Sequence, residues 1–403
     1  MDALTNPYTP NAGAEPQAVV GRDDQLQLFD LLLARIQRGR TEQSMIITGL
    51  RGVGKTVLLG QFRTKALQQD WRVVEIEVSK NDDSDFRRQI GSKLRTALFD
   101  LSPRARWGDR LQHAAAVLRS FTVSVDPAGA VSAGFDVDIA EGYADNNDLT
   151  MDLTEVFIAM GEAANEKSTG VVLLLDEIQF LSKTQLEALI QAMHKMVQRK
   201  LPITMVGAGL PQIAELAGDA KSYAERLFKF PVIGNLDHND ARTALTEPAE
   251  EEGITFTDDA LDAAAEITEG YPYFLQELGY AVWTIASAPT ITRSDIDTAS
   301  EGYEAKLDES FFRVRLDRCT ELERAYLRAM AQLGPEPQKA ADVAALMGRT
   351  SQNLGPTRAK LINMGLLYTP EHGYAAFTVP QFDKFLIRAI PTLKTPSHKP
   401  RGR

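Results

Sequence analysis

The sequence lacks disulfide chemistry, long apolar runs and a net positive charge, and each absence excludes a class of protein. Cys319 is the single cysteine among 403 residues, so neither a disulfide framework nor a cysteine-rich zinc site can form. No apolar run approaches about 18 residues, and residues 1–17 have no apolar region of a signal peptide. The ordinary globular composition also excludes collagen and wholesale disorder. We therefore expect a cytoplasmic protein of two or three domains, with no membrane partner.

Charge is distributed unevenly along the chain. The formal net charge is −11, which taken alone argues against nucleic acid. Residues 318–403 nevertheless hold 13 Lys and Arg against 6 Asp and Glu, a net charge of +7, and the preceding 317 residues carry −18. Two interpretations stand. The basic end contacts nucleic acid, or it is a solvated tail, since the last ten residues supply +4 of the charge.

Hydrophobic patterning predicts an α/β core over residues 19–235. Short apolar strands alternate with helices, which is typical of a parallel sheet covered on both faces. The predicted strands are Met45–Thr48, Arg72–Val78, Val171–Leu175, Ile203–Val206 and Phe228–Val232. Residues 1–18 are expected to form a disordered arm. Alternating residues in Thr122–Val125 and Phe135–Ile139 predict a β-hairpin inserted at about 121–139, which either grips a partner or elaborates the surface.

The rest of the chain predicts two further domains. An all-helical pattern from Asp237 to Phe312 predicts a helical lid at 236–317. Three helices and a strand pair then predict a winged helix-turn-helix at 318–393, followed by a basic tail at 394–403.

The strongest motif is a complete G-x-x-x-x-G-K-T sequence between a predicted strand and a predicted helix. Its glycines turn backbone N–H groups toward a phosphate, and the helix N-terminus favours the anion. Lys55 is expected to reach the β- and γ-phosphates, and Thr56 to bind Mg²⁺. The residues predicted to bind ATP or ADP here are Gly49, Gly52, Val53, Gly54, Lys55, Thr56 and Val57.

A second motif follows the apolar strand Val171–Leu175, which runs into Asp176 and Glu177. Asp176 is expected to hold Mg²⁺ and Glu177 to polarise the attacking water. An acidic cap on the next helix is the alternative, and the nearby P-loop disfavours it. A water-activating glutamate also distinguishes an ATP hydrolase from a small-molecule kinase. The strand at Ile203–Val206 would carry a sensor residue, but it runs into Gly207-Ala208. Thr204 is an unconvincing substitute, so the sensor stays unassigned.

With these motifs the chain resembles AAA+ ATPases of the origin-recognition and initiator type, together with the related archaeal-type and STAND signalling ATPases. Gly21 and Arg22 resemble the family's adenine-contacting box, and the resemblance extends over residues 19–390. Arg226 stands where the family often has an arginine finger, which acts on a neighbour's γ-phosphate and requires a homo-oligomer. A surface arginine paired with Glu225 or another nearby acid is the alternative.

The predicted lid departs from the initiator pattern because no sensor arginine opens its helix. Gly270-Tyr271-Pro272 instead resembles the STAND motif, in which Pro272 would pack near adenine. A plain helix start explains the same proline.

The winged helix offers a set of residues for double-stranded DNA. Gln and Asn read adenine edges, whereas Arg and Lys contact phosphate or guanine. The predicted DNA contacts are Arg349, Gln352, Asn353, Arg358, Lys360 and His372. The sequence thus predicts a slow ATPase whose nucleotide state controls DNA binding. The alternative is a STAND-like switch with a protein partner, in which the winged helix packs on the nucleotide domain.

Overall fold

The computed structural model describes residues 1–102, 108–123 and 137–396. The chain divides into two compact units. The core unit combines Arg22–Gly49 with Lys55–Ile233, and the lid unit combines Met1–Gly21, Leu50–Gly54 and Gly234–Arg403. The domain boundaries that the sequence predicts stay predictions.

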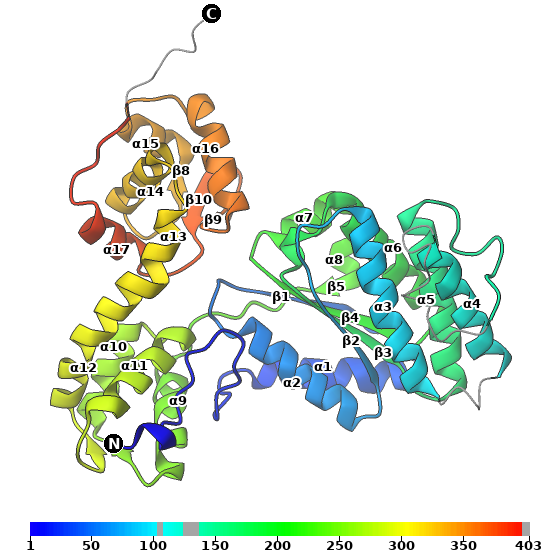
Figure 1. Cartoon of the computed structure of the whole chain (residues 1–403), viewed down its shortest axis with the longest axis horizontal. Helices are drawn as coiled ribbons and strands as arrows, with labels where there is room; N and C mark the ends of the chain where they lie inside the picture. The colour runs from blue at the N-terminus through cyan, green and yellow to red at the C-terminus, as the bar shows by residue number, and fades with distance from the viewer. Residues whose placement is uncertain (103–107, 124–136, 397–403) are drawn as a thin grey trace, which may run out of the picture. The chain divides into compact units, whose positions relative to one another are not determined.

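The core unit is built on a five-stranded parallel sheet in the order β2-β3-β4-β1-β5 (Figure 1). The strands are β1 (Ser44–Thr48), β2 (Arg72–Glu77), β3 (Val171–Asp176), β4 (Ile203–Gly209) and β5 (Phe228–Lys229). All of β1 and β4 is buried, as is β3 up to Asp176. Unbroken burial is what a parallel strand covered on both faces requires, and it explains why the apolar runs predicted these strands.

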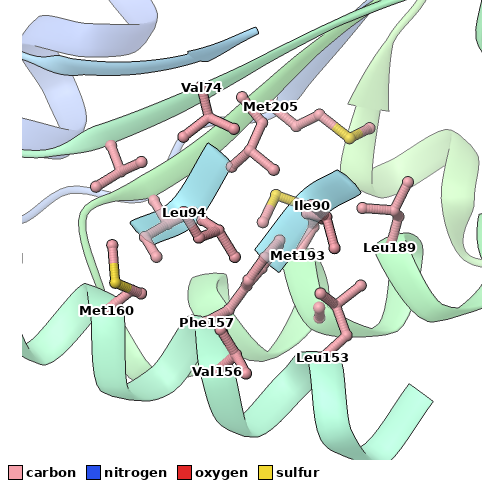
Figure 2. Close-up of a cluster of buried hydrophobic side chains, with 14 of the residues drawn as sticks. Val74, Ile90, Leu94, Leu153, Val156, Phe157, Met160, Leu189, Met193 and Met205 are labelled. Atoms are coloured by element: carbon pink, nitrogen blue, oxygen red, sulfur yellow. The ribbon is translucent and has the colours of Figure 1, made fainter. Parts of the chain in front are cut away.

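Helices cover both faces of this sheet (Figure 1). Three long helices pack on one face, where Figure 2 shows Val74 and Met205 of the sheet beside Phe157 and Met193. These are α3 (Asp83–Leu101), α5 (Leu149–Glu166) and α6 (Lys183–Arg199). On the other face, Phe29 stacks on Phe62 at 4.4 Å between ring centroids and joins α1 (Asp23–Gln37) to α2 (Lys55–Gln68). The remaining core helices are α4 (Asp109–Val123), α7 (Ile213–Ala220) and α8 (Ala224–Leu227).

The predicted hairpin insertion is wrong where the structure describes it. Thr122 and Val123 are the last residues of helix α4, and the Thr122 hydroxyl donates to the carbonyl of Leu118 at 3.1 Å. This bond keeps a β-branched residue inside the helix. Residues 137–139 form no strand, and the predicted turn lies in 124–136, outside the described residues.

The lid unit contains a group of helices and a short parallel strand pair. The helices are α9 (His238–Glu251), α10 (Asp258–Thr268), α11 (Pro272–Ile285) and α12 (Arg293–Lys306), and the strands are β6 (Thr255–Phe256) and β7 (Thr290–Ile291). Helix α12 continues through a π-helical turn, Leu307–Phe312, into α13 (Arg313–Asp317). Among the described residues, no helix is both long and apolar enough to cross a lipid bilayer.

The last part of the lid unit, Glu321–Ala389, is here termed the C-terminal helix–sheet domain. It contains three helices, a small antiparallel sheet in the order β8-β10-β9 and a final helix, and strand β8 lies between the first and the second helix. Its elements are α14 (Glu321–Leu333), β8 (Gln338–Lys339), α15 (Ala340–Leu346), α16 (Ser351–Asn363), β9 (Leu367–Tyr368), β10 (Tyr374–Phe377) and α17 (Phe382–Ala389). The three helices and the strand pair β9 and β10 follow the order that the sequence predicted, whereas β8 and α17 were not predicted.

The prediction of a disordered arm is wrong for the first residues of the chain. Tyr8 is 1% exposed, and its hydroxyl donates to the Leu245 carbonyl at 2.6 Å. The Trp283 indole N–H donates to the Asp2 carbonyl at 2.9 Å. Gly279 provides the space, because a Cβ there would lie 2.6 Å from the Tyr8 ring. One buried aromatic side chain thus orders a segment whose polar composition predicts disorder.

Candidate functional site

The P-loop joins β1 to α2 with the backbone that its glycines allow. Gly52 and Gly54 have φ angles of +82° and +93°, a region that L side chains rarely adopt. Val53 is 1% exposed, and Val57 is half-buried in the first turn of α2. Lys55 is 8% exposed, and its ammonium donates to the Gly49 carbonyl at 3.0 Å. The P-loop therefore ends at the N-terminus of helix α2, where an anion is favoured.

Thr56 and Asp176 meet at the carboxyl edge of the sheet. The Thr56 hydroxyl donates to Asp176 Oδ2 at 2.6 Å, and both side chains remain accessible. A hydroxyl and a carboxylate at this separation are oxygen ligands of the kind that Mg²⁺ prefers, with phosphate and water completing its shell. Among the described residues, no group of three or more His, Cys, Asp and Glu could hold a metal by itself. The pair therefore fits a cation shared with a nucleotide.

Glu177 follows Asp176 in an unusual backbone conformation. Its φ of +55° is rare for a residue with a side chain, and such conformations cluster at functional sites. Its N–H donates to Asp176 Oδ1 at 2.8 Å, and its half-buried carboxylate accepts a hydrogen bond from the Gln179 amide. The Asp176 carboxylate is thus directed to Thr56, and the Glu177 carboxylate is held beside the Asp176 carboxylate.

Strand β4 lies between β1 and β3, as expected for a sensor strand, but Thr204 is not placed to act as one. Thr204 is level with Val172, early in the strand, and its buried hydroxyl bonds the Ser44 hydroxyl at 3.0 Å. The sequence motifs did not identify Gln179, which lies in the 3-10 turn Ile178–Phe180. The glycines at 207 and 209 were the signal, because they make room for this turn.

The predicted adenine contacts are distributed over both units. Gly21 has a φ of +67° and belongs to the lid unit, whereas Arg22 is 8% exposed in the core unit. Pro272 is the first residue of α11 in the lid unit and is half-buried. Their roles toward adenine stay predictions.

Arg226 lies on the short helix α8, and its side chain is exposed. Within the described part of the chain it forms no ion pair, so the alternative partner Glu225 is not engaged. An exposed arginine at this position fits a role in trans, which stays a prediction.

The P-loop tip also contacts other residues of the lid unit. The Arg51 N–H donates to the Thr378 carbonyl at 3.1 Å, and its guanidinium lies against Gly365. At Gly52, a Cβ would lie 2.9 Å from the Tyr271 hydroxyl. Burial, together with the charge of Arg51, lowers the pKa of the nearby Arg315 guanidinium. Arg51 thus lies against the backbone of Gly365 and Thr378, and Gly52 lies against the Tyr271 side chain, which precedes helix α11.

The basic residues of the C-terminal helix–sheet domain are largely engaged inside the lid unit. Arg358 donates to the Tyr374 carbonyl at 2.8 Å, Lys360 pairs with Glu323 at 2.7 Å, and Arg349 donates to the Pro396 carbonyl at 2.5 Å. By contrast, Gln352, Asn353 and His372 are exposed. Half of the residues predicted to contact DNA therefore bond other groups of the lid unit.

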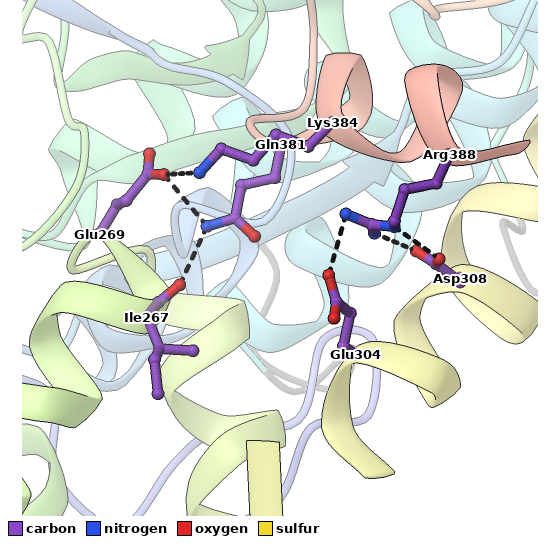
Figure 3. Close-up of polar contacts among 7 residues, drawn as sticks. All are labelled: Ile267, Glu269, Glu304, Asp308, Gln381, Lys384 and Arg388. Atoms are coloured by element: carbon purple, nitrogen blue, oxygen red, sulfur yellow. Dashed lines mark hydrogen bonds and ion pairs between the residues drawn. The ribbon is translucent and has the colours of Figure 1, made fainter. Parts of the chain in front are cut away.

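Helix α17 continues this pattern. Lys384 pairs with Glu269 at 2.7 Å, and Gln381 donates to the Ile267 carbonyl at 3.0 Å (Figure 3). Arg388 bridges Asp308 at 2.6 Å and Glu304 at 2.9 Å. These contacts neutralise part of the basic end that the charge count revealed.

Comparison with known proteins identifies the core. Residues 18–206 match the family model described as an AAA ATPase domain, a range that includes the P-loop, Asp176 and Glu177. The chain therefore carries an AAA ATPase domain that binds ATP. Residues 309–386 match a domain of unknown function, DUF8462. A search of curated proteins finds no match to this sequence.

Two solved structures share the fold over nearly the whole chain. The Walker-type ATPase PABY2304 of Pyrococcus abyssi has a TM-score of 0.54 at 15% identity. The similarity covers 92% of this chain and 97% of the chain of PABY2304. The ORC2 protein of Aeropyrum pernix, in ADPNP-ADP complexes, has a TM-score of 0.54 at 14% identity, with 95% and 98% covered. The ORC1 protein of the same organism, solved with DNA, has a TM-score of 0.46 at 15% identity, with 93% of this chain and 94% of that protein covered.

Proposed function

We propose that this AAA ATPase is a molecular switch that couples its nucleotide state to the binding of double-stranded DNA. The observation that carries the proposal is the start of α16. Thr350 caps this helix through a hydrogen bond to the Asn353 N–H at 3.3 Å, and Gln352 and Asn353 are exposed in its first turn. A winged helix reads the major groove with the N-terminal residues of this helix. The exposed His372, between β9 and β10, would contact the sugar–phosphate backbone of the DNA.

Hydrolysis would use the groups at the carboxyl edge of the core sheet. Lys55 and the P-loop N–H groups bind the phosphates, and Thr56 with Asp176 holds Mg²⁺. The cation, when bound, neutralises charge on the phosphate oxygens. Glu177 accepts a proton from the attacking water as a general base. Arg226 would act on a neighbouring copy's nucleotide, which makes turnover slow in a monomer.

Filter binding of a double-stranded probe at two salt concentrations, with and without ATP, tests the coupling. Gln352→Ala with Asn353→Ala should weaken binding by about 10-fold or more, since each specific base contact contributes about 1–3 kcal/mol. The exposed Gln198→Ala on α6 serves as the matched control and should bind like the parent chain. Equal binding with and without ATP, or no binding at either salt concentration, would refute the coupling.

A second candidate function rests on the contacts of Arg51. Because the P-loop tip contacts Thr378 and Gly365, the C-terminal helix–sheet domain could act as an intramolecular switch, as the STAND resemblance implies. In that case the partner is a protein, and ATP promotes assembly without DNA. Light scattering during an ATP titration separates the two functions. A chain that stays monomeric with ATP and binds DNA contradicts this second function.

A further inference from the structure

The carboxyl end of β4 contacts the P-loop through its backbone alone. The strand ends in Gly207-Ala208-Gly209, and Gly209 is level with Thr48, the last residue of β1. The Gly209 carbonyl accepts a hydrogen bond from the Gly49 N–H at 3.2 Å. Because glycine and alanine have no polar side chain, this strand end offers no side chain that could orient Glu177 or a water molecule.

Gln179 supplies a polar side chain at this position. Its Oε1 accepts a hydrogen bond from the Leu210 N–H at 3.1 Å, and its Nε2 donates to the Glu177 carboxylate. A backbone N–H can only donate, so it fixes the orientation of the amide and directs the NH₂ group to Glu177. One side chain therefore joins the catalytic carboxylate to the end of β4.

The glycines of β4 are explained by the same turn. A Cβ at Gly209 would lie 2.8 Å from Gln179 Oε1 and 3.1 Å from Ile178 Cγ1, and a Cβ at Gly207 would lie 2.7 Å from Ile178 Cδ1. Any larger residue at 209 would displace the Gln179 amide. The small residues that leave β4 without a sensor side chain thus also make the room that Gln179 occupies.

We propose that Gln179 is a positioning residue, which holds the Glu177 carboxylate and ties it to the end of β4 in place of the sensor side chain that β4 lacks. The proposal rests on hydrolysis by Glu177. The backbone of Glu177 is fixed at a φ of +55°, and its carboxylate takes its direction from the partner it bonds.

Steady-state ATP hydrolysis by the full chain tests this role. Gln179→Ala should lower kcat by about 10- to 100-fold, the range seen when a partner that orients a functional ligand is lost. The KM for ATP should change by less than about twofold, because Gln179 acts after ATP is bound. Gln179→Glu should lose as much, since a carboxylate cannot donate to Glu177. Gln198→Ala, on exposed α6 surface, should keep the parental kcat.

A double-mutant cycle with Gly209→Ala distinguishes positioning from general damage. Alone, Gly209→Ala should lower kcat because its Cβ displaces the amide. In the Gln179→Ala background it should add less than about twofold, since residues that act through one contact are not additive. Parental kcat in Gln179→Ala, or penalties that multiply in the double variant, would overturn the proposal.

The contact also has a readout that needs no turnover. The NH₂ signals of the Gln179 side chain can be assigned in the NMR spectrum of the parent chain, because they are missing from the spectrum of Gln179→Ala. These signals should shift in Glu177→Ala, and unchanged signals would overturn the proposal. A parent chain that shows this contact but hydrolyses no ATP would instead contradict the proposed hydrolysis. The two failures are therefore distinguishable.

Discussion

The carboxyl edge of the core sheet and helix α16 both carry residues that the sequence selects, and they use their polar groups differently. At the sheet edge, Thr56 bonds Asp176, and Glu177 lies next in the chain, in a cluster that remains accessible. On α16, Arg358 and Lys360 bond the Tyr374 carbonyl and the Glu323 carboxylate of their own domain.

The difference shows that a motif specifies the positions of its residues, whereas a charge count does not. The P-loop spacing specifies glycine conformations and a helix start, so it also specifies where Lys55 and Thr56 lie. A net charge of +7 specifies no geometry, and Lys360, Lys384 and Arg388 prove to be paired with acids. Exposed polar residues are then the better candidates for DNA contact.

The largest expected effect is at the sheet edge. Glu177→Gln should lower kcat for ATP by about 10²- to 10⁴-fold, because an amide cannot accept the proton of the attacking water. ATP affinity should be kept, since the P-loop is unchanged. Turnover assays with a parallel nucleotide-binding titration measure both quantities. The exposed Glu215→Gln on α7 is the control, and near-parental turnover in Glu177→Gln would remove Glu177 from the mechanism.

On α16 the effect should be on stability. Lys360→Ala leaves the Glu323 carboxylate, 5% exposed, without its cation. The free energy of unfolding in urea should fall by about 1–3 kcal/mol, the cost of a buried acceptor left without its partner. Gln352→Ala, exposed on the same helix, should change it by less than about 0.5 kcal/mol. An unchanged stability in Lys360→Ala with weaker DNA binding would show that Lys360 serves DNA instead.

A smaller effect should appear in the pH dependence of the same pair. Burial alone would raise the pKa of Glu323, but the hydrogen bond and charge of Lys360 and the hydrogen bonds of Thr320 outweigh it and lower the pKa below its ordinary value. A lowered pKa in the folded state stabilises the fold above the unfolded pKa of about 4.3, and this contribution is lost as the pH falls further. The difference between the parent chain and Lys360→Ala should therefore shrink below about pH 4. A difference independent of pH would exclude the ion pair as its cause.

The sequence predicted the parts of the fold that depend on local patterns. Buried runs such as Val171–Leu175 specify parallel strands, and the P-loop specifies its own conformation. It missed contacts that tertiary packing creates. Gln179 is recognisable only when the glycine of β4 at 209 is seen to face it, and Tyr8 is ordered by a space that Gly279 leaves. The partner of Lys360 lies on another helix, so composition could not reveal that the charge is used.

The most direct test of the account is the ATPase rate with and without double-stranded DNA, at several protein concentrations. A switch that couples the nucleotide state to DNA predicts a rate that changes when DNA is added and, with Arg226 acting in trans, a specific rate that rises with protein concentration. A rate that is the same with and without DNA at every concentration would contradict the coupling.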